Sequence, residues 1–558
     1  MRNLFVTLLI ALLVTACAPV PTDSEHVVIS VIGTNDVHGE LVARDDRGGL
    51  TTFSGYVAAI RAARADDGAV LLVDGGDMWQ GTLESNLNEG EAIVEIYNVL
   101  GYAAATIGNH DFDFGPVGPR AIPEDDGDDP QGALRARAAE ANFPLVAANL
   151  IDTTTGEIVD WENVQASTLV SRAGVQIGII GILTTGTPAT TIKANIRGIE
   201  IAPLAESIEE QALQLRSAGA NLVIVVAHAG SRCSEFDDPF DTSSCIMRGE
   251  IMRVAQALPE GLVDHIVGGH VDGGIAHDVN GIAVTSAYKS TRAFGRVDFV
   301  IDRATGEVVE RRIFPPQKIE PDVVYEGRPV VPMPDVVAIA EQAVAVAEER
   351  LKDSLGVYLE TPMLHRNRPE SALGNLMTTA ILETNDGDVS IHNIWGGIRA
   401  ELPEGELTYG DVFRMFPFDN RVAVVELSGA ELRRLIAKQA NNTRRAAGFA
   451  GMQVFVSCDA GRMSLSMQRP DGTRIEDTDT VRVVSNDFLL LGGDEIFTPV
   501  MPEGGFEWSN GAPLVRDQVV QWFRDKGGRM HADQFFNPDK LRWNRPDPMP
   551  EDCELPGA

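Results

Sequence analysis

The sequence predicts an α/β protein of two domains joined by a helix, and three observations support this. The chain has 558 residues, more than one average domain and enough for large cores. Short apolar, strand-like runs alternate with helical patterns from residue 26 to about 315. A long segment rich in Ala, Val and Glu then separates this region from a second mixed region.

The first domain is expected at 26–330. Its apolar runs are continuous, which is typical of strands buried on both faces, and helical patterns at 50–65 and 203–220 lie between several of them. This alternation favours a layered core of strands and helices. The strand candidates are 27–32, 69–76, 104–108, 175–182, 221–228 and 265–269.

The segment 334–355 follows the Pro-rich VVPMP and is predicted to be a linker helix. The second domain is expected at 356–545. It combines helical patterns with β-like runs, so it also reads as mixed α/β. Its helices are expected at 372–384 and 429–440, and its strands include 421–427 and 480–486.

Residues 1–17, MRNLFVTLLIALLVTAC, read as an export signal: one Arg, an apolar run and small residues before Cys17. The end, Val-Thr-Ala-Cys, resembles a bacterial lipobox, in which the cysteine becomes the acylated first residue. A plain signal peptide is the alternative. The apolar run is too short for a transmembrane helix. We therefore expect a protein of the cell envelope or periplasm, attached to the membrane by an N-terminal lipid anchor.

The net charge limits the kinds of ligand that this protein can bind, and the cysteines limit its disulfides. Lys and Arg total 46 against 81 Asp and Glu, a net charge of −35, which argues against nucleic-acid polymers as partners. A small phosphate ester held by a metal stays open, and no protein partner is implied. Four cysteines remain after Cys17, and four allow three pairings. We expect Cys233 to pair with Cys245, which leaves Cys458 for Cys553.

Polar residues with metal-binding side chains recur where the apolar runs of the first domain end. The carboxyl ends of strands in an α/β sheet converge on one crevice, so these residues are expected to meet. A lone His or Asp after a strand is usually a cap or loop residue, but this ordered recurrence favours a site. The residues are Asp36, His38, Asp77, Asn109, His110, Asp113, His228, His270 and Asp272.

The set suits two divalent metal ions. Asp, Asn and His side chains together favour first-row or similarly hard metals over a soft thiolate site, which leaves Zn, Mn, Co, Mg and Fe open. Asp77 is a candidate bridge because one carboxylate has two oxygens. Two ions about 3.5–4 Å apart can hold a hydroxide and the oxygens of an in-line displacement. Asp36 and His38 stand at positions i and i+2 of a segment that we expect to be extended, so they should face the same way.

With these motifs the sequence resembles the 5′-nucleotidase family of the calcineurin-like metallophosphoesterases. The resemblance covers nearly the whole mature chain. It implies a four-layer α/β/β/α sandwich followed by a smaller nucleotidase C-terminal domain. The matching blocks are GTNDVHGEL (33–41), DGGDMWQGT (74–82), TIGNHDFDFG (106–115), AANL (147–150), VVAHAG (225–230), GGH (268–270), GNLMTTAIL (374–382), GGIRAELPEGELTYGDVFRMFPFDN (396–420) and NDFLLLGGD (486–494).

The resemblance implies roles for the first-domain residues. Asp36 and His38 match ligands of one metal, and Asp77 matches the bridge. The ligands of the other metal match Asn109, His228 and His270. His110 and Asp113 resemble the catalytic dyad, in which an imidazolium oriented by a carboxylate stabilises charge on the phosphoryl oxygens. The nucleophile would be a metal-activated water, so no covalent intermediate is implied.

The resemblance also assigns substrate-binding residues. Phe418 and Phe488 match the two aromatics that sandwich the base, although core packing is the other interpretation of such rings. Asp494 matches a ribose-hydroxyl acceptor and Arg399 a substrate-binding arginine. A further arginine is either Arg366 or Arg368, because the match there is offset by about one residue.

The sequence departs from the family at two places. Ile394 and Trp395 stand where relatives have Asn followed by small residues, which leaves the base preference open. Asp272 stands where relatives have His or Gln. It lies two residues beyond His270, and we expect it to be a metal ligand if that segment is extended; the alternative is a turn formed with the following glycines.

The sequence therefore predicts a dinuclear metallophosphatase that hydrolyses nucleoside 5′-monophosphates. A 2′,3′-cyclic-nucleotide 2′-phosphodiesterase with 3′-nucleotidase activity and a UDP-sugar hydrolase are the enzymatic alternatives. A surface lipoprotein that binds nucleotides without turnover is the alternative from another class.

Overall fold

The computed structural model describes residues 25–118, 120–125, 127–365, 370–441, 447–503, 505–506, 512–546, 549–550 and 553. The expected signal segment 1–17 with Cys17, and both Arg366 and Arg368, lie outside these residues. No helix of the described ranges combines the length and the apolar character that crossing a bilayer requires.

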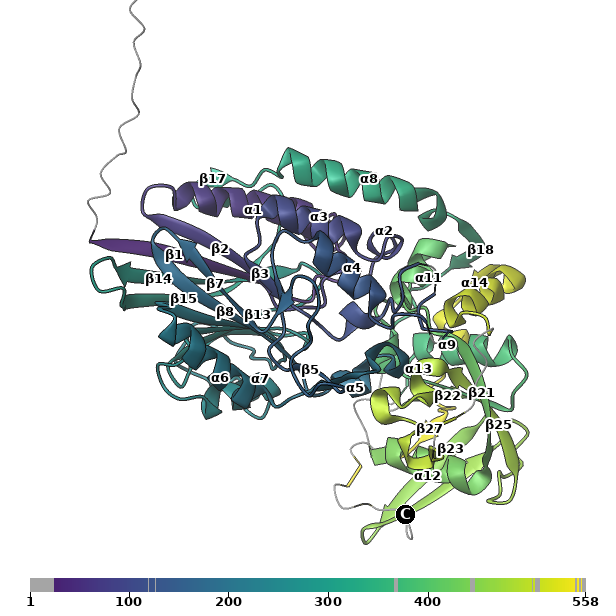
Figure 1. Cartoon of the computed structure of the whole chain (residues 1–558). Helices are drawn as coiled ribbons and strands as arrows, with labels where there is room; N and C mark the ends of the chain where they lie inside the picture. The colour runs from purple at the N-terminus through teal and green to yellow at the C-terminus, as the bar shows by residue number, and fades with distance from the viewer. Residues whose placement is uncertain are drawn as a thin grey trace, which may run out of the picture.

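Two mixed sheets pack face to face in the N-terminal domain (Figure 1). The first has the order β15-β14-β1-β2-β3-β4-β6 and the second the order β12-β13-β11-β10-β8-β7. The strands of the first are β15 (Val308–Lys318), β14 (Ala293–Asp302), β1 (His26–Thr34), β2 (Gly68–Asp74), β3 (Ala104–Thr106), β4 (Leu145–Val146) and β6 (Val164–Gln165). Those of the second are β12 (Gly274–Val279), β13 (Ile282–Ala287), β11 (His265–Gly268), β10 (Leu222–His228), β8 (Val175–Leu183) and β7 (Ser167–Arg172).

Helices cover the outer faces of both sheets, so the layers run α/β/β/α (Figure 1). This confirms the predicted fold class. The first sheet is covered by α1 (Gly49–Ala63), α3 (Glu91–Leu100), α4 (Gly132–Glu140) and part of α8 (Pro334–Leu351), and the second by α6 (Leu204–Ser217) and α7 (Glu250–Ala257). Shorter elements are α2 (Leu83–Asn86), α5 (Thr187–Thr190), β5 (Leu150–Asp152), β9 (Ile199–Ile201), β16 (Val324–Tyr325), β17 (Arg328–Pro329), and the 3-10 turns η1 (His110–Phe112) and η2 (Lys193–Ile196).

Strand β10 shows why the apolar runs are continuous rather than alternating. Its side chains at 222, 224 and 226 join the core between the two sheets. Those at 223, 225 and 227 join the core beneath α6 and α7. Successive side chains of a strand point to opposite faces, so a strand with a core on each side is apolar at every position.

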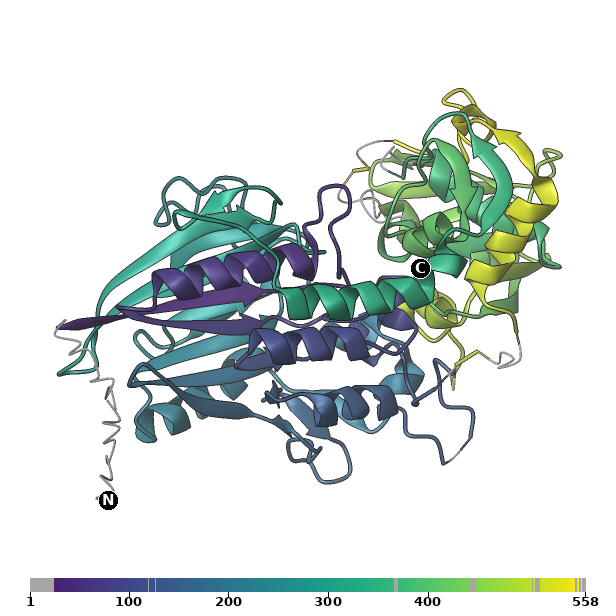
Figure 2. The same cartoon turned by 90° about the horizontal axis from the view of Figure 1, so that it is seen from above.

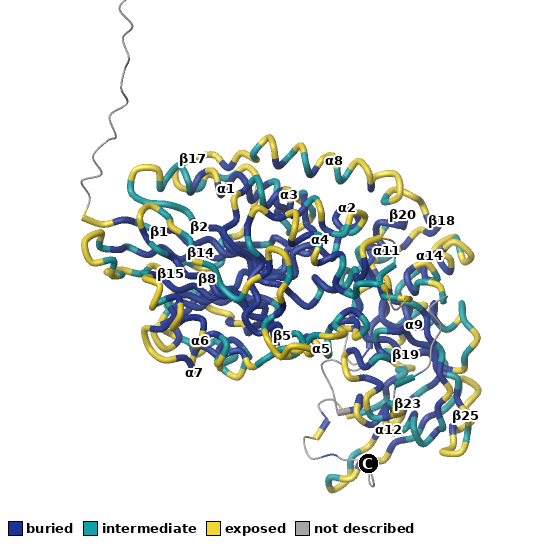
Figure 3. Tube along the Cα trace, in the orientation of Figure 1, coloured by how far each residue is buried: buried dark blue, intermediate teal, exposed yellow. Residues whose placement is uncertain are grey.

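Helix α8 connects the two domains and belongs to both cores. Its buried residues are Val336, Ala340 and Ala347, which share one face. The first two pack into the core of the N-terminal domain and Ala347 into that of the C-terminal domain. The outer side of α8 is exposed (Figure 3). Figure 2 shows α8 alongside α1 and α3, ending at the smaller domain.

The described residues of the C-terminal domain form three small sheets, ordered β20-β18-β26, β21-β25-β19-β22 and β24-β23-β27. Their strands are β18 (Ser354–Leu359), β19 (Val389–His392), β20 (Gly405–Thr408), β21 (Val422–Ser428), β22 (Gly448–Ala450), β23 (Gln453–Asp459), β24 (Arg462–Gln468), β25 (Thr480–Asn486), β26 (Gly528–Met530) and β27 (Trp543–Asn544). Its helical elements are α9 (Ala372–Glu383), α10 (Ile394–Gly397), α11 (Tyr409–Met415), α12 (Gly429–Asn441), α13 (Asp487–Leu490), α14 (Val515–Lys526), η3 (Gly493–Glu495), η4 (Thr498–Val500) and η5 (Ala532–Gln534).

Candidate functional site

Six of the expected ligand residues gather where the strands of both sheets end. The loops after β1, β2 and β3 carry Asp36, His38, Asp77 and Asn109, while β10 ends at His228 and β11 leads into His270. Parallel pairing of β1 with β2, of β2 with β3, and of β10 with β11 brings these carboxyl ends together.

The loops that hold these residues turn sharply. Asp36, His38, Asp77 and His270 all have left-handed backbones, with φ between 48° and 70°. We expected an extended segment at Asp36 and His38, and that geometry is wrong. Hydrogen bonds hold the turns instead: Asp36 donates its backbone N–H to Gly76 O at 2.9 Å, and His38 donates to Asp77 O at 3.0 Å. Such strain clusters at functional sites.

One group of ligand atoms comes from Asp36, His38 and Asp77. One ligand atom from each lies within 4.8 Å of the others. His38 Nδ1 lies 2.9 Å from the carbonyl oxygen of Gln80 and so donates to it. The other ring nitrogen, Nε2, faces Asp77 Oδ2, 3.9 Å away. A hydrogen bond to the remote ring nitrogen is the usual way in which a protein orients a metal-binding histidine.

A second group comes from Asn109, His228 and His270. Asn109 Oδ1 lies 3.0 Å from His228 Nε2 and 2.9 Å from His270 Nδ1, and these two nitrogens are 3.3 Å apart. His228 Nδ1 lies 2.9 Å from Gly75 O, so Nε2 is left to face the site. Atoms that bind one ion at about 2.0–2.2 Å lie about 3 Å from one another, so the separations among these three atoms are those of a metal site.

Asp77 lies between the two groups. Its Oδ2 is 3.2 Å from His228 Nε2 and 3.9 Å from His38 Nε2, and its Oδ1 accepts the backbone N–H of His110 at 2.8 Å. Burial opposes charge on His228, but Asp77, Asp36 and the Gly75 carbonyl together outweigh it and raise the pKa of this imidazole to about 10. The carboxylates thus favour a positive charge at this position, which a divalent cation supplies better than a proton.

The expected dyad is also formed. His110 Nδ1 lies 2.7 Å from Asp113 Oδ2, because the 3-10 turn at η1 brings these two side chains together. The His110 ring is 5.8 Å from that of His38. Burial raises the pKa of the Asp113 carboxyl, while His110 acts in the opposite direction.

The C-terminal domain reaches into this site. Arg399 Nη2 contacts His110 Nε2 directly. The Phe418 ring lies 5.5 Å from the His110 ring and 5.1 Å from the Arg399 guanidinium carbon. Gln80 Nε2 also donates to Pro417 O at 3.2 Å. Residues far apart in sequence therefore form one site between the domains.

Phe488, in α13, and Asp494, in the 3-10 turn η3, lie close together in the C-terminal domain. The Phe488 ring packs directly against Gly493. A Cβ at position 493 would lie only 2.4 Å from the ring, so a side chain there would clash with it. Asp494 has a left-handed backbone, and its Oδ2 accepts Asn393 Nδ2 at 2.6 Å. Among the described ring contacts of Phe418, the partners are His110 and Phe416, not Phe488.

Asp272 does not join the ligand group. Its carboxylate pairs with Arg292 at 2.5 Å, and its side chain is 42% exposed. Our expectation assumed an extended segment. Instead, His270 has a left-handed φ of 70°, and Val271 donates its N–H back to Gly269 O at 2.8 Å. This tight turn removes the relation between positions i and i+2 that holds in a strand.

Sequence reasoning missed two residues that support the site. Asp111 is fully buried and accepts the backbone N–H groups of Asp77, Met78 and Gly108 at 3.1, 2.9 and 2.7 Å, which braces the Asp77 loop. It was visible in the GNHDFDFG motif beside His110. Gln80 orients His38 through its backbone carbonyl oxygen. The sequence could not indicate this role, because every residue has a backbone carbonyl.

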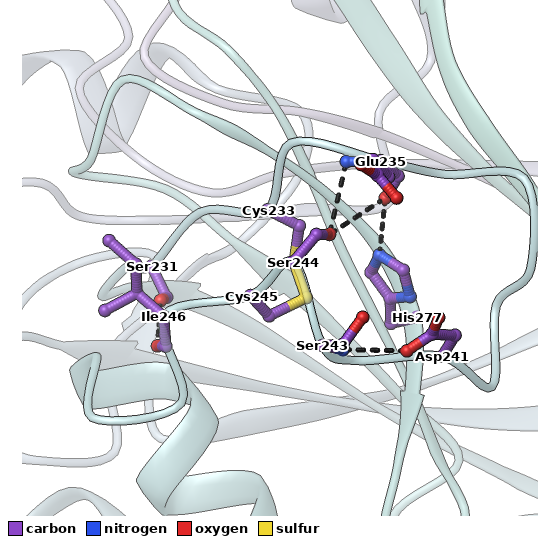
Figure 4. The surroundings of a disulfide bond; sticks show 9 residues. All are labelled: Ser231, Cys233, Glu235, Asp241, Ser243, Ser244, Cys245, Ile246 and His277. Carbon is purple, nitrogen blue, oxygen red and sulfur yellow. Dashed lines mark hydrogen bonds between the residues drawn. A yellow bond between two sulfur atoms is a disulfide. The ribbon is translucent and has the colours of Figure 1, made fainter.

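A disulfide fastens the loop that follows His228 (Figure 4). Cys233 is joined to Cys245, and Cys458 to Cys553. Ser231 Oγ donates to Ile246 O at 2.6 Å across the base of the loop. Cys233 also donates its N–H to Gly274 O at 2.8 Å, and Gly274 lies four residues beyond His270. The bridge thus lies between the segments that carry two candidate ligands.

Comparisons with known proteins agree with this architecture. Residues 350–502 match the model of the 5′-nucleotidase C-terminal domain. The chain is 27% identical over 492 residues to the protein named Endonuclease YhcR of Bacillus subtilis, covering 85% of this chain but 38% of that protein. It is 25% identical over 553 residues to a 5′-nucleotidase of Vibrio vulnificus, covering 91% of this chain and 92% of that one.

A solved structure shares the fold. The crystal structure of a 5′-nucleotidase precursor from Thermus thermophilus matches with a TM-score of 0.72 and 21% identity, covering 93% of this chain and 99% of that chain. At this identity the likeness describes the architecture and leaves the chemistry to the site residues.

Proposed function

The chain belongs to the 5′-nucleotidase family, a family of phosphoesterases, and from this premise we propose that it hydrolyses nucleoside 5′-monophosphates to nucleoside and inorganic phosphate. The main support is the convergence of two ligand groups with a dyad that the other domain contacts through Arg399. Neither domain carries all of these groups, so the proposed reaction depends on both.

The proposed cofactors are two divalent ions, with Zn, Mn, Co, Mg and Fe as candidates. Asp36 and His38 would hold one ion, Asn109, His228 and His270 the other, and Asp77 both. When bound, such ions supply Lewis acidity and a water acidic enough to act as nucleophile. The fit rests on the carboxylates and on histidine nitrogens whose remote ring atoms already donate elsewhere.

The chain's own groups would act on the phosphoryl oxygens. Asp113 holds the proton on His110 Nδ1 and so directs Nε2 toward Arg399. The Arg399 guanidinium at this position would stabilise charge that develops on the phosphoryl oxygens, and so would His110 once its Nε2 carries a proton; such stabilisation is the largest contribution in many enzymes. Arg366 or Arg368 remains a proposed addition to this set.

The nucleoside would bind on the C-terminal domain. We propose that Phe418 and Phe488 stack on the base and that Asp494 accepts a ribose hydroxyl. Stacking accepts every base, which fits a broad nucleotidase. The contact of Phe418 with His110 supports this, because it brings one wall of the base site next to the dyad.

We also propose a division into a catalytic domain at 26–330, a linker helix at 334–355 and a substrate-binding domain at 356–545. The protein would be exported and held at the membrane by lipidated Cys17. A nucleic-acid polymer is not a proposed substrate, although one relative is named an endonuclease, because the net charge of −35 would repel it.

Phosphate release from AMP tests the function. Chelated enzyme should be inactive and should recover with added Mn²⁺, Co²⁺ or Zn²⁺. His110→Ala should retain its metals but lose turnover. The panel should include 3′-AMP, a 2′,3′-cyclic nucleotide and a UDP-sugar. Faster cleavage of any of these would select the corresponding enzymatic alternative. Nucleotide binding without phosphate release under any metal would select the non-catalytic lipoprotein.

A further inference from the structure

A cavity that opens to solvent lies beside the candidate metal site, between the two domains, with about 430 Å³ of empty space when the adjoining open solvent is included. It opens onto His38, which belongs to the first ligand group. The N-terminal domain contributes Lys289 and Gln80 to its wall, and the C-terminal domain contributes Arg399 and Arg414. A ligand in this cavity would therefore contact His38 and both domains at once.

The cations of this cavity are not equally neutralised. Arg414 pairs with Asp411 at 2.6 Å, and Arg47 at the rim pairs with Glu40. Arg399 contacts His110, which offers a ring nitrogen but no carboxylate. Within the described ranges, the ammonium group of Lys289 makes neither a hydrogen bond nor an ion pair, and the residue lies half-buried. In a chain of net charge −35, two such cations facing one cavity indicate an anionic ligand.

The backbone around Lys289 is held in place. Its neighbours Tyr288 and Ser290 have left-handed φ values of 60° and 56°. Asn35 accepts the N–H of Ala287 at 3.0 Å and donates to Tyr288 O at 2.5 Å, and Ser290 donates its N–H to Asp36 O at 2.7 Å. The loop is therefore tied to the segment that carries the ligand Asp36, so Lys289 keeps a set position relative to the site.

We propose that Lys289 is a further substrate-binding residue, which with Arg399 grips the oxygens of the phosphoryl group and of the phosphate product. This inference rests on the proposed function and deepens it. A tetrahedral dianion offers oxygens in several directions, so it can accept from Lys289 on one domain and from Arg399 on the other. Burial, and then the nearby Arg399, lower the pKa of Lys289 to about 8, as expected where two cations await an anion.

Inhibition by inorganic phosphate tests this proposal without requiring a nucleotide. The metal-loaded full chain is assayed on p-nitrophenyl phosphate with increasing phosphate. Lys289→Met should raise both the KM and the phosphate inhibition constant about tenfold or more, as loss of a charge-assisted hydrogen bond does. Lys289→Arg should restore most of the difference. Lys318→Met removes an exposed lysine of the same domain and should behave as wild type.

Two results would overturn the proposal. One is an unchanged phosphate inhibition constant in Lys289→Met. The other is loss of bound metal in both Lys289 variants, since the lysine would then support the loop rather than the substrate. The nucleotide question is separate: if wild type cleaves the aryl phosphate but not AMP, the proposed function fails while the phosphate constants still decide the role of Lys289.

Discussion

Asp487, at the start of α13, should make the stability of this protein depend on pH. The residue is 1% exposed and precedes Phe488 of the proposed base site. Burial raises the pKa of its carboxyl to about 7, against an ordinary value of 3.8, although the backbone N–H groups of Arg421 and Phe488 donate to it. The native state thus keeps this proton over a pH range in which the unfolded chain has lost it.

The sign and size of the effect follow from this difference. Between the two pKa values the unfolded state binds fewer protons, so the free energy of unfolding falls as pH rises. Each pH unit is worth at most about 1.36 kcal/mol, and the slope halves where the native carboxyl is half ionised, so stability should drop by about 2 kcal/mol from pH 5 to pH 7 through Asp487 alone. About one unit above pH 7 the carboxyl is ionised in both states, and the loss levels off.

Asp487→Asn should remove this dependence. Both hydrogen bonds are accepted by Oδ1, at 3.0 and 2.8 Å, and the asparagine retains a carbonyl oxygen there. Urea unfolding of the full chain, followed by circular dichroism at several pH values, would give the difference between variant and wild type. That difference should grow by about 2 kcal/mol from pH 5 to pH 7 and reach a plateau by about pH 8, because contributions of other groups cancel.

The exposed Asp539 provides a matched control. Asp539→Asn makes the same chemical change where the carboxylate stays in water, so its stability should follow the wild-type curve. If the Asp487→Asn curve also runs parallel to wild type, the buried carboxyl does not hold its proton and the reasoning is refuted.

Three further predictions concern the site. His110→Ala should lower turnover by about 100-fold or more while the metal content stays at the wild-type level, as measured by elemental analysis; loss of metal would make His110 a ligand. Phe418→Ala and Phe488→Ala should each weaken AMP use by about 1–3 kcal/mol in kcat/KM but spare p-nitrophenyl phosphate, and equal losses on both substrates would mean that the rings only pack the core. Cys233 and Cys245 are separated by 12 in sequence, and replacing both by serine should lower the free energy of unfolding by about 3 kcal/mol. The same variant should lose its metal to a chelator faster than wild type. Unchanged metal retention would show that the bridge does not support the site.

Local sequence patterns were enough to predict most of the architecture. The six strand candidates of the first domain correspond to β1, β2, β3, β8, β10 and β11, and the helices at 50–65 and 203–220 correspond to α1 and α6. Continuous apolar runs indicated strands buried on both faces, and the two cores on either side of β10 confirm this. The order of polar residues after these strands singled out the residues that the fold brings together, because parallel strands end at one edge.

Positions of individual side chains depended on the tertiary structure. Asp272 has the chemistry of a ligand, but the left-handed turn at His270 directs it to Arg292. Lys289 is one lysine in an unremarkable loop, and only the meeting of two domains places it in a cavity with Arg399. Periodicity and motifs report what each segment prefers by itself. Backbone turns and contacts between distant segments arise only when the segments pack, so the sequence determined the fold and the ligand types, whereas packing decided which side chains share the site.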